Sequence, residues 1–173
     1  MKDITFRTKD FYMMEVRDTK GKKIGLIKDI DINFSQGRLV GFVLSSSSFF
    51  SRNVKVLIEN IVAFNEVMIV NKTSIEKAMG FKAIEGLEVI DTNNNILGIV
   101  DELIFDGEKF EIKGLIISSG LIKDFVLGKR ILLCKNLILG EENILCIDSS
   151  NKIDFLSKPH KLIMEADVHE KMV

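Results

Sequence analysis

The chain has 173 residues, of which 46% are apolar and 28% are charged, and its formal net charge is −1. This composition is typical of a soluble globular protein, and the near-zero charge argues against a protein that mainly neutralises nucleic-acid phosphates. No run of about 18 apolar residues could span a bilayer, and charges interrupt the N-terminus too often for a signal peptide. We therefore expect a cytoplasmic protein with no transmembrane segment and no direct nucleic-acid binding.

An internal repeat is the main feature of the sequence. At a shift of 73 positions (88 − 15), residues 15–46 fall on residues 88–119 without a gap. Two copies of one unit predict two small domains of roughly 70 residues each. The expected division is a first repeat over residues 1–71, a linker over 72–83, a second repeat over 84–150 and a tail over 151–173.

In chain order, residues 1–13 lead into the first strand, and Thr8-Lys9-Asp10-Phe11 suggests a short helical turn. The strand at Met14–Val16 ends in a hairpin tip. The sequence of this tip is Asp18-Thr19-Lys20-Gly21 in the first copy and Asp91-Thr92-Asn93-Asn94-Asn95 in the second. Glycine and asparagine both tolerate positive φ, so the two different sequences predict the same type of turn.

The next strand runs from Ile24 to Asn33. Two adjacent charges, Lys28-Asp29, interrupt its apolar pattern, and Asp101-Glu102 do the same in the second copy; such pairs predict a bulge. The third strand contains Gly41, or Gly114 in the second copy, which predicts a bend or a close backbone approach. We expect the later strands at residues 39–45, 54–58, 62–64 and 67–70, and at 112–118, 130–134, 138–139 and 144–147.

Many short strands separated by turns predict a mainly β fold of two tandem small barrels. Each copy is expected to hold its own full strand set, so residues 84–150 alone should retain β structure and unfold cooperatively. Between the copies, Thr73-Ser74-Ile75-Glu76 has capping-box spacing and Gly80 suits a helix end, which predicts a short helical turn. Residues 160–172, after Pro159, are good helix formers and predict a C-terminal helix that docks on the barrels or on another protein.

The strand and turn pattern carries a family resemblance. Glu-Val-x-Asp-Thr (15–19) leads to Ile-Gly-x-Ile-x-Asp-Ile-x-Ile (24–32), then to Leu-Val-Gly-Phe-Val-Leu (39–44) and Val-Leu-Ile-Glu-Asn-Ile-Val-Ala-Phe (56–64). This pattern resembles the PRC-barrel family, over about Phe11–Val70 and Ile84–Asp148. The family includes the cytoplasmic barrel of the photosynthetic reaction-centre H subunit, the C-terminal domain of the ribosome maturation factor RimM, and stand-alone bacterial proteins with one or two barrels.

The resemblance implies a protein-interaction module with no catalytic residue set and no cofactor. Neither a membrane helix like that of the H subunit nor an RNA-related domain like that of RimM is seen in the sequence. Our first hypothesis is a non-enzymatic adaptor or assembly module whose partner is an unidentified protein, a second copy of the chain included. The alternative is a regulatory domain that binds a small molecule or ion in the groove between the barrels. A third, weaker hypothesis is an RNA-processing or ribosome-associated factor.

The histidines and cysteines do not indicate a metal site or a redox site. His160 and His169 are the only histidines, and neither has a cysteine or carboxylate at the spacing of a metal site. At a shift of 76 (136 − 60), Cys134 and Cys146 fall on β-branched residues of the first copy. They are therefore predicted to be small core residues rather than a disulfide or redox pair.

Two carboxylate positions recur in both copies. Asp18 and Asp91 fit the capping of a turn, and Asp29 and Glu102 fit a bulge. These structural roles are favoured over a paired-carboxylate site.

Large apolar side chains break the rule that loops are polar. The connection after Ser46 carries Phe49 and Phe50, and its counterpart carries Leu121, Ile122 and Phe125. These five residues are the candidate partner-binding residues if they are exposed, because exposed apolar side chains mark interaction sites. The favoured interpretation is nevertheless that both connections fold back to plug a barrel end.

Overall fold

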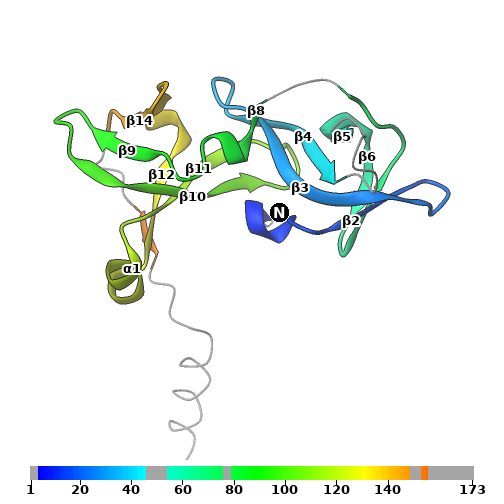
Figure 1. The fold of residues 1–173 in the computed structure, drawn as a ribbon, viewed down its shortest axis with the longest axis horizontal. Coiled ribbons are helices and arrows are strands. Elements are labelled where there is room, and N and C mark those ends of the chain that lie inside the picture. The colour runs from blue at the N-terminus through cyan, green and yellow to red at the C-terminus, as the bar shows by residue number, and fades with distance from the viewer. Residues whose placement is uncertain (1–3, 46–53, 76–78, 149–152, 156–173) are drawn as a thin grey trace, which may run out of the picture.

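The computed structural model describes residues 4–45, 54–75, 79–148 and 153–155. Two β units lie side by side along the long axis of the molecule (Figure 1). The first repeat contains β1 (Thr5–Arg7), the 3-10 helix η1 (Thr8–Asp10), β2 (Glu15–Asp18), β3 (Lys23–Asn33), β4 (Arg38–Ser45), β5 (Val54–Leu57), η2 (Ile58–Asn60), β6 (Ile61–Phe64) and β7 (Val67–Val70). The second contains β8 (Met79–Gly80), η3 (Phe81–Ala83), β9 (Glu88–Asp91), β10 (Ile96–Asp106), β11 (Ile112–Ser118), α1 (Leu121–Leu127), β12 (Lys129–Leu133), η4 (Cys134–Asn136), β13 (Leu137–Leu139), β14 (Asn143–Cys146) and β15 (Ile153–Phe155).

Both repeats have the same sheet topology. The strand order is β5-β4-β3-β2-β7-β6 in one sheet and β12-β11-β10-β9-β14-β13 in the other, where β15 is added beside β12. Neighbouring strands are antiparallel except for the pairs β2–β7 and β9–β14, which are parallel. The predicted mainly β fold of two tandem barrel-like units is therefore confirmed.

The predicted hairpin tip is present in both copies. Gly21 has φ of 81° and Asn94, the equivalent residue, has φ of 61°, which is the conformation that glycine and asparagine tolerate. The Asp18 carboxylate accepts hydrogen bonds from the backbone N–H groups of Lys20 and Lys22. Asp91 accepts the same two bonds, from residues 93 and 95. The carboxylates at this position thus stabilise the turn, as predicted.

The long strands bend where the sequence predicted it. The register of β3 against β4 shifts between Ile27 and Asp29, and that of β10 against β11 shifts between Val100 and Glu102. Gly41 and Gly114 lie where the next strand passes so close that a Cβ would overlap a backbone carbonyl oxygen. Both predictions, of a bulge and of a close backbone approach, are confirmed.

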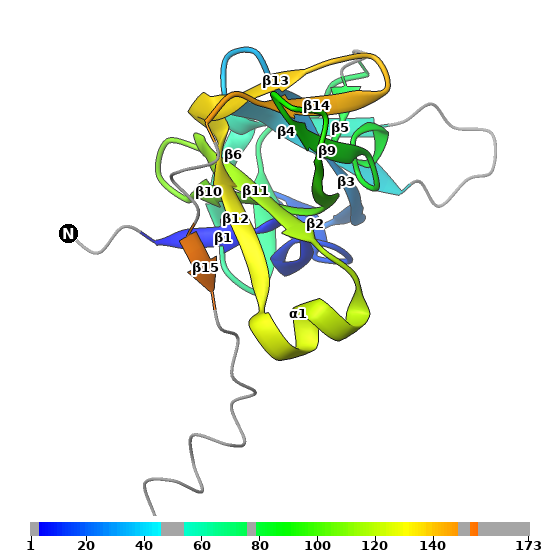
Figure 2. The same ribbon diagram turned by 90° about the vertical axis from the view of Figure 1, so that its left-hand side faces the viewer.

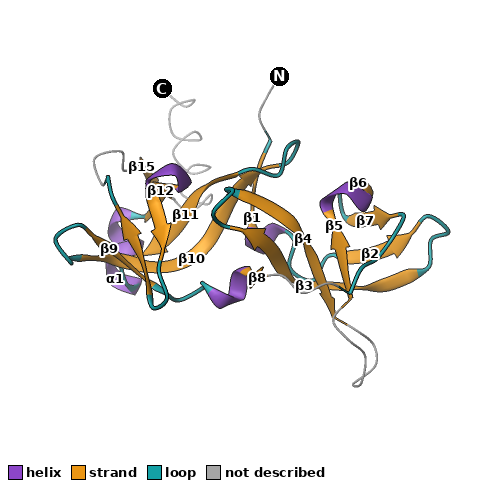
Figure 3. Cartoon of the chain, turned by 90° about the horizontal axis from the view of Figure 1, so that it is seen from above, coloured by secondary structure: helices purple, strands orange, loops and turns teal. Residues whose placement is uncertain are grey.

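The first strand of each repeat pairs with the sheet of the other repeat. Strand β1 pairs with β10, with Phe6 opposite Phe105, and β8 pairs with β3, with Met79 opposite Ile32. These are equivalent pairs, because both members differ by 73 positions (79 − 6 and 105 − 32). The repeats therefore exchange their first strands, which lie between the two barrels (Figure 3). The expectation that each copy holds its own full strand set is not met.

An approximate two-fold axis relates the repeats. Arg38 and Glu111, which are equivalent positions (111 − 38 = 73), form an antiparallel bridge with each other. Beside them, Leu39 N–H donates to Phe110 C=O at 2.9 Å and Ile112 N–H donates to Gly37 C=O at 2.7 Å. Each of these bonds becomes the other when the repeats are interchanged. Such reciprocal contacts are those of a two-fold symmetric dimer, here formed within one chain.

The hydrophobic core is continuous between the repeats. Its buried side chains come from both sheets and form one cluster. Phe11 of the first repeat packs on Phe105 of the second, with ring centroids 5.5 Å apart, and on Phe42 of its own repeat at 5.0 Å. Strand exchange and shared core together make the two repeats one packed body.

Three sequence predictions on the connecting segments have different outcomes. The helical turn at Thr8–Asp10 is confirmed. The turn between the repeats exists but lies later than predicted, at Phe81–Ala83, because Ser74 bridges to Lys55 and Met79–Gly80 forms the exchanged strand β8. The C-terminal helix predicted for residues 160–172 lies outside the described residues. Strand β15, in the segment expected to be a tail, was not predicted.

Candidate interaction surfaces

Helix α1 is attached to the end of the second barrel by the carboxylate of Asp124. This carboxylate accepts hydrogen bonds from the Ser118 hydroxyl at 2.5 Å and from the Ser119 N–H at 2.8 Å. Glycines with positive φ stand at both ends of the helix: Gly120 at 105° and Gly128 at 79°. These turns let the chain leave β11, form two helical turns and enter β12. The helix lies apart from the sheets (Figures 1 and 2).

Three apolar side chains of this helix are exposed to solvent. Leu121 is 92% exposed, Ile122 is 82% exposed and Phe125 is 88% exposed. The interpretation of this connection as a barrel plug is therefore wrong. The physical reason is that the hydrogen bonds of Asp124 hold α1 to the chain that leaves β11, in a position where the side chains of residues 121, 122 and 125 meet solvent. We call these three side chains the α1 patch.

The corresponding connection of the first repeat carries Phe49 and Phe50. Both residues lie outside the described residues, so their role as partner-binding residues or as a plug stays a prediction.

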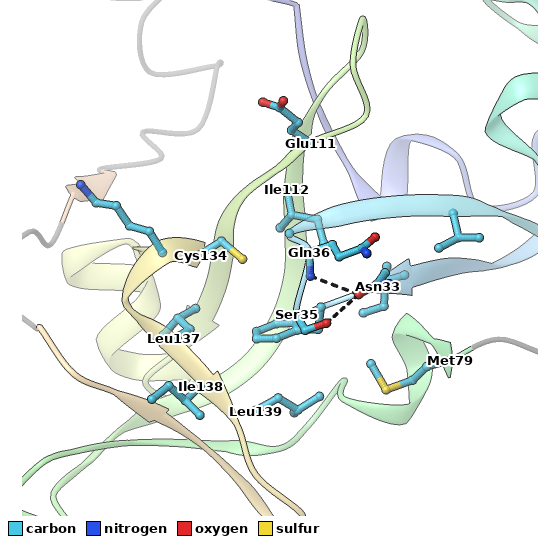
Figure 4. Close-up of a pocket in the computed structure, with 15 residues that line it drawn as sticks. Asn33, Ser35, Gln36, Met79, Glu111, Ile112, Cys134, Leu137, Ile138 and Leu139 are labelled. Carbon is cyan, nitrogen blue, oxygen red and sulfur yellow. Dashed lines mark hydrogen bonds between the residues drawn. The ribbon is translucent and has the colours of Figure 1, made fainter.

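A concave feature lies between the repeats and is lined by residues of both. This inter-repeat groove has a volume of about 970 Å³ and is formed by the turn after β3, strand β8, the start of β11, η4 and β13. Figure 4 shows the turn residues Asn33, Ser35 and Gln36 across from Leu137, Ile138 and Leu139. The Asn33 side-chain oxygen accepts hydrogen bonds from the Ser35 hydroxyl at 2.9 Å and the Gln36 N–H at 3.1 Å, which fixes this turn. The groove required by the alternative hypothesis is thus present.

Sequence reasoning did not identify the residues that line this groove. A signal was nevertheless present in the repeat itself: at the shift of 73, Phe6 falls on Met79 and Phe110 falls on Gly37. Met79 of the second copy and Gly37 of the first are thus each smaller than their equivalents, and a cavity is expected where such smaller residues of the two copies meet.

Neither cysteine forms a disulfide in the described part of the chain, as the repeat predicted. Cys146 is buried in the core, and Cys134 is half-buried at the groove. Burial raises the pKa of the Cys134 thiol. A thiol with a raised pKa is a weak nucleophile at neutral pH, which fits a packing role rather than a redox or catalytic one.

The recurring carboxylates of the bulges hold the exchanged segments. Asp29 accepts hydrogen bonds from the N–H groups of Ile30 at 2.8 Å and Lys82 at 3.2 Å. Burial raises the pKa of Asp29, although these N–H donors oppose the rise. Glu102, its equivalent, forms an ion pair with Lys9 at 3.0 Å. Since Lys9 and Lys82 are themselves equivalent, the two carboxylates have one structural role: each anchors the first segment of the other repeat.

The described residues contain no group of three or more histidine, cysteine or acidic side chains that could hold a metal ion. Within the same part of the chain, no helix combines the length and the apolar character needed to cross a membrane.

Two β barrels with a shared core, an exposed apolar helix and a groove are the features of a binding domain. The family model of the PRC-barrel domain matches the chain twice, at residues 3–75 and 76–149. The chain therefore belongs to the PRC-barrel family, as the strand pattern predicted. PRC-barrel domains are non-catalytic interaction modules. A search of curated proteins finds no match for the chain.

Proposed function

We propose that this protein is a non-enzymatic, cytoplasmic adaptor or assembly module whose contact with its protein partner is the α1 patch. The observation that carries the proposal is the exposure of Leu121, Ile122 and Phe125, each above 80%, on one short helix. Large apolar side chains gathered on an otherwise polar surface mark interaction sites. The family supports the same function, because PRC-barrel domains act through interactions.

The anchoring of α1 favours recognition by a preformed surface. The helix is held by Asp124 and begins and ends at fixed turns, so few backbone conformations are lost on binding. A rigid apolar patch suits an apolar groove or helix face on the partner, where aromatic and aliphatic anchors supply most of the binding energy.

The test replaces the α1 patch by polar residues in the full-length protein, as Leu121→Ser, Ile122→Ser and Phe125→Ser together. Since all three side chains are exposed, the free energy of unfolding should change by less than about 0.5 kcal/mol per substitution. Affinity purification from the native host should then lose a partner that the unchanged protein recovers in stoichiometric amount. A matched control is Val62→Ser with Ile96→Ser, which removes apolar side chains of 58% and 62% exposure elsewhere.

The control variant should recover the partner as well as the unchanged protein does. Recovery of the same partner by the α1 patch variant would contradict the proposal. Sedimentation of both variants separates a foreign partner from a second copy of the chain, because self-association through α1 would be lost in the first variant alone.

A second candidate function is the regulatory binding of a small molecule in the inter-repeat groove. The volume of about 970 Å³ favours it, since ligand sites in proteins are typically about 300–1,000 Å³.

A further inference from the structure

The two-fold relation between the repeats creates two equivalent sites, and one of them is filled with aromatic rings. We call this the aromatic site. Its members pack in a closed cycle with ring centroids 5.6–6.4 Å apart, and they are Phe6, Phe64, Phe110 and Phe105. A small cavity of about 140 Å³ is lined by Ile4, Asp106, Glu108, Lys109 and Lys113, two of which adjoin these rings in sequence.

The equivalent of this small cavity is the inter-repeat groove. At the shift of 73, four of the five residues that line the small cavity fall on Asn33, Ser35, Gln36 and Val40, and all four of these line the groove. The two spaces are therefore one feature of the fold, seen twice. They differ in volume, at about 140 Å³ and about 970 Å³.

The groove is larger because each of the four rings has been replaced by a smaller group. Met79 stands for Phe6, Ile32 for Phe105 and Gly37 for Phe110. Leu139 stands for Phe64, because Phe64 lies opposite Met68 in the strand pair β6–β7 and Leu139 lies opposite Ile144 in the pair β13–β14. All four replacements line the groove.

Other parts of the groove suit an aromatic guest. Phe34 lines it and supplies a ring for edge-to-face or offset stacking. Asn33, Ser35 and Gln36 offer hydrogen-bonding groups at the rim. The charged residues of the lining are Glu111 and Lys135, of opposite sign, so the groove has no net charge to select an ion.

We infer that the inter-repeat groove is a binding site for a small, uncharged aromatic compound, whose ring takes the place that phenylalanine rings fill in the aromatic site. The inference deepens the second candidate function and rests on it. It is independent of the α1 patch, which belongs to another surface.

The repeat itself supplies the variant that closes the groove. Gly37 has φ of 61° and its equivalent Phe110 has φ of 56°, so the fold already holds phenylalanine in this backbone conformation. A Cβ at Gly37 would meet only the Cys134 sulfur, at 3.8 Å, which is ordinary contact. Gly37→Phe should therefore fold and fill the groove. Gly21→Phe is the matched control, since it places the same side chain at another positive-φ glycine, in open space.

The experiment titrates the full-length protein with phenol, and separately with cyclohexanol, while backbone amide signals are followed by NMR. Phenol should shift the signals of Gly37, Cys134 and Leu139 in the unchanged protein and in Gly21→Phe. These shifts should be lost in Gly37→Phe. Cyclohexanol, which has the same size and hydroxyl group but no aromatic ring, should bind more weakly. The α1 patch variant should bind phenol like the unchanged protein.

Each contrary result has one meaning. If neither compound shifts the groove signals, the second candidate function and this inference are both wrong. If cyclohexanol binds as well as phenol, the groove binds small molecules but the aromatic class is wrong. Phenol shifts that persist in Gly37→Phe would place the site elsewhere and overturn the inference. A thermal melt checks the folding of Gly37→Phe; if that variant is unfolded, Leu139→Phe, which copies Phe64, replaces it in the same titration.

Discussion

The ammonium of Lys55 lies 2.7 Å from the carboxylate of Asp31, with side chains that are only 4% and 1% exposed. The equivalent positions of the second repeat hold Ile104 and Ile131, which occupy the same places in the strand pairs β10–β11 and β11–β12. One repeat thus buries an ion pair where the other packs two isoleucines. Among the described residues, the second carboxylate oxygen of Asp31 has no hydrogen-bond partner, so the pair is incompletely compensated.

The exchange of this pair for isoleucines is the first prediction. Asp31→Ile or Lys55→Ile alone should lower the free energy of unfolding by about 3–5 kcal/mol, because an unpaired charge stays buried. The double variant should recover most of this loss or exceed the unchanged protein, because hydrophobic replacement of a buried pair is often neutral or stabilising. Urea unfolding of the unchanged protein, the two single variants and the double variant measures the coupling free energy between Asp31 and Lys55.

A control for these variants is the half-exposed ion pair of Lys129 and Asp101, whose ammonium and carboxylate lie 2.6 Å apart. Lys129→Met should cost less than about 1 kcal/mol, as exposed ion pairs do. Additive losses in the double Asp31 and Lys55 variant would contradict the prediction.

The second prediction concerns acid stability through Asp106. Burial by itself would raise the pKa of this carboxyl, but the N–H groups of Lys109 and Glu108 and the ammonium of Lys113 outweigh burial and lower it below its usual 3.8. A carboxyl whose pKa is lower in the folded state stabilises the fold above its unfolded pKa. This stabilisation is lost as the pH falls through the folded pKa.

Asp106→Asn tests this linkage and copies Asn33, the equivalent residue that caps the same turn in the first repeat. The variant should be less stable than the unchanged protein at pH 7, and the difference should vanish as the pH falls below the folded pKa. Urea unfolding across the pH range measures it, with the exposed Glu108→Gln as the control. A difference that is constant with pH would show that the carboxyl acts only as a hydrogen-bond acceptor.

The third prediction concerns Gly41 and Gly114. A side chain at either position would overlap a backbone carbonyl oxygen, that of Val56 or that of Leu132. Gly41→Val and Gly114→Val should each lower the free energy of unfolding by about 1–3 kcal/mol, because the neighbouring strand has to move. Val62→Ala, at an exposed position of β6, should change it by less than about 0.5 kcal/mol. Unaltered melting temperatures in both valine variants would refute the close approach.

The fourth prediction follows from the exchange of β1 and β8. Residues 76–149 alone keep β8 but lose both its partner β3 and the strand β1 that covers β10. Two such fragments can restore the missing pairs by exchanging β8, so the fragment should form a dimer. Residues 84–150, which lack β8, should stay monomeric. Sedimentation equilibrium distinguishes the two, and a monomeric 76–149 fragment with full stability would show that the exchange is dispensable.

The sequence determined the local features of this protein. The repeat, the strand periodicity, the turn at Gly21 and Asn94 and the bulges at residues 28 and 101 all depend on neighbouring residues and on backbone conformational preferences. Comparison of the two copies strengthened each prediction. Equivalent positions often hold different residues that share one physical property, such as tolerance of positive φ, and both copies then predict the same local structure. The family followed from the same pattern.

Only the tertiary structure decided which edges pair and which apolar side chains are covered. Strands β1 and β8 carry too few residues to specify a partner. Their pairing with the opposite repeat depends on strand edges that are about 100 positions away for β1 and about 50 for β8. Phe125 is as apolar as Phe105, yet it is 88% exposed and Phe105 is fully buried. Both side chains have the same hydrophobic tendency to be buried. The hydrogen bonds of Asp124 hold α1 at a place where Phe125 meets solvent, whereas Phe6 of the exchanged strand β1 packs on Phe105.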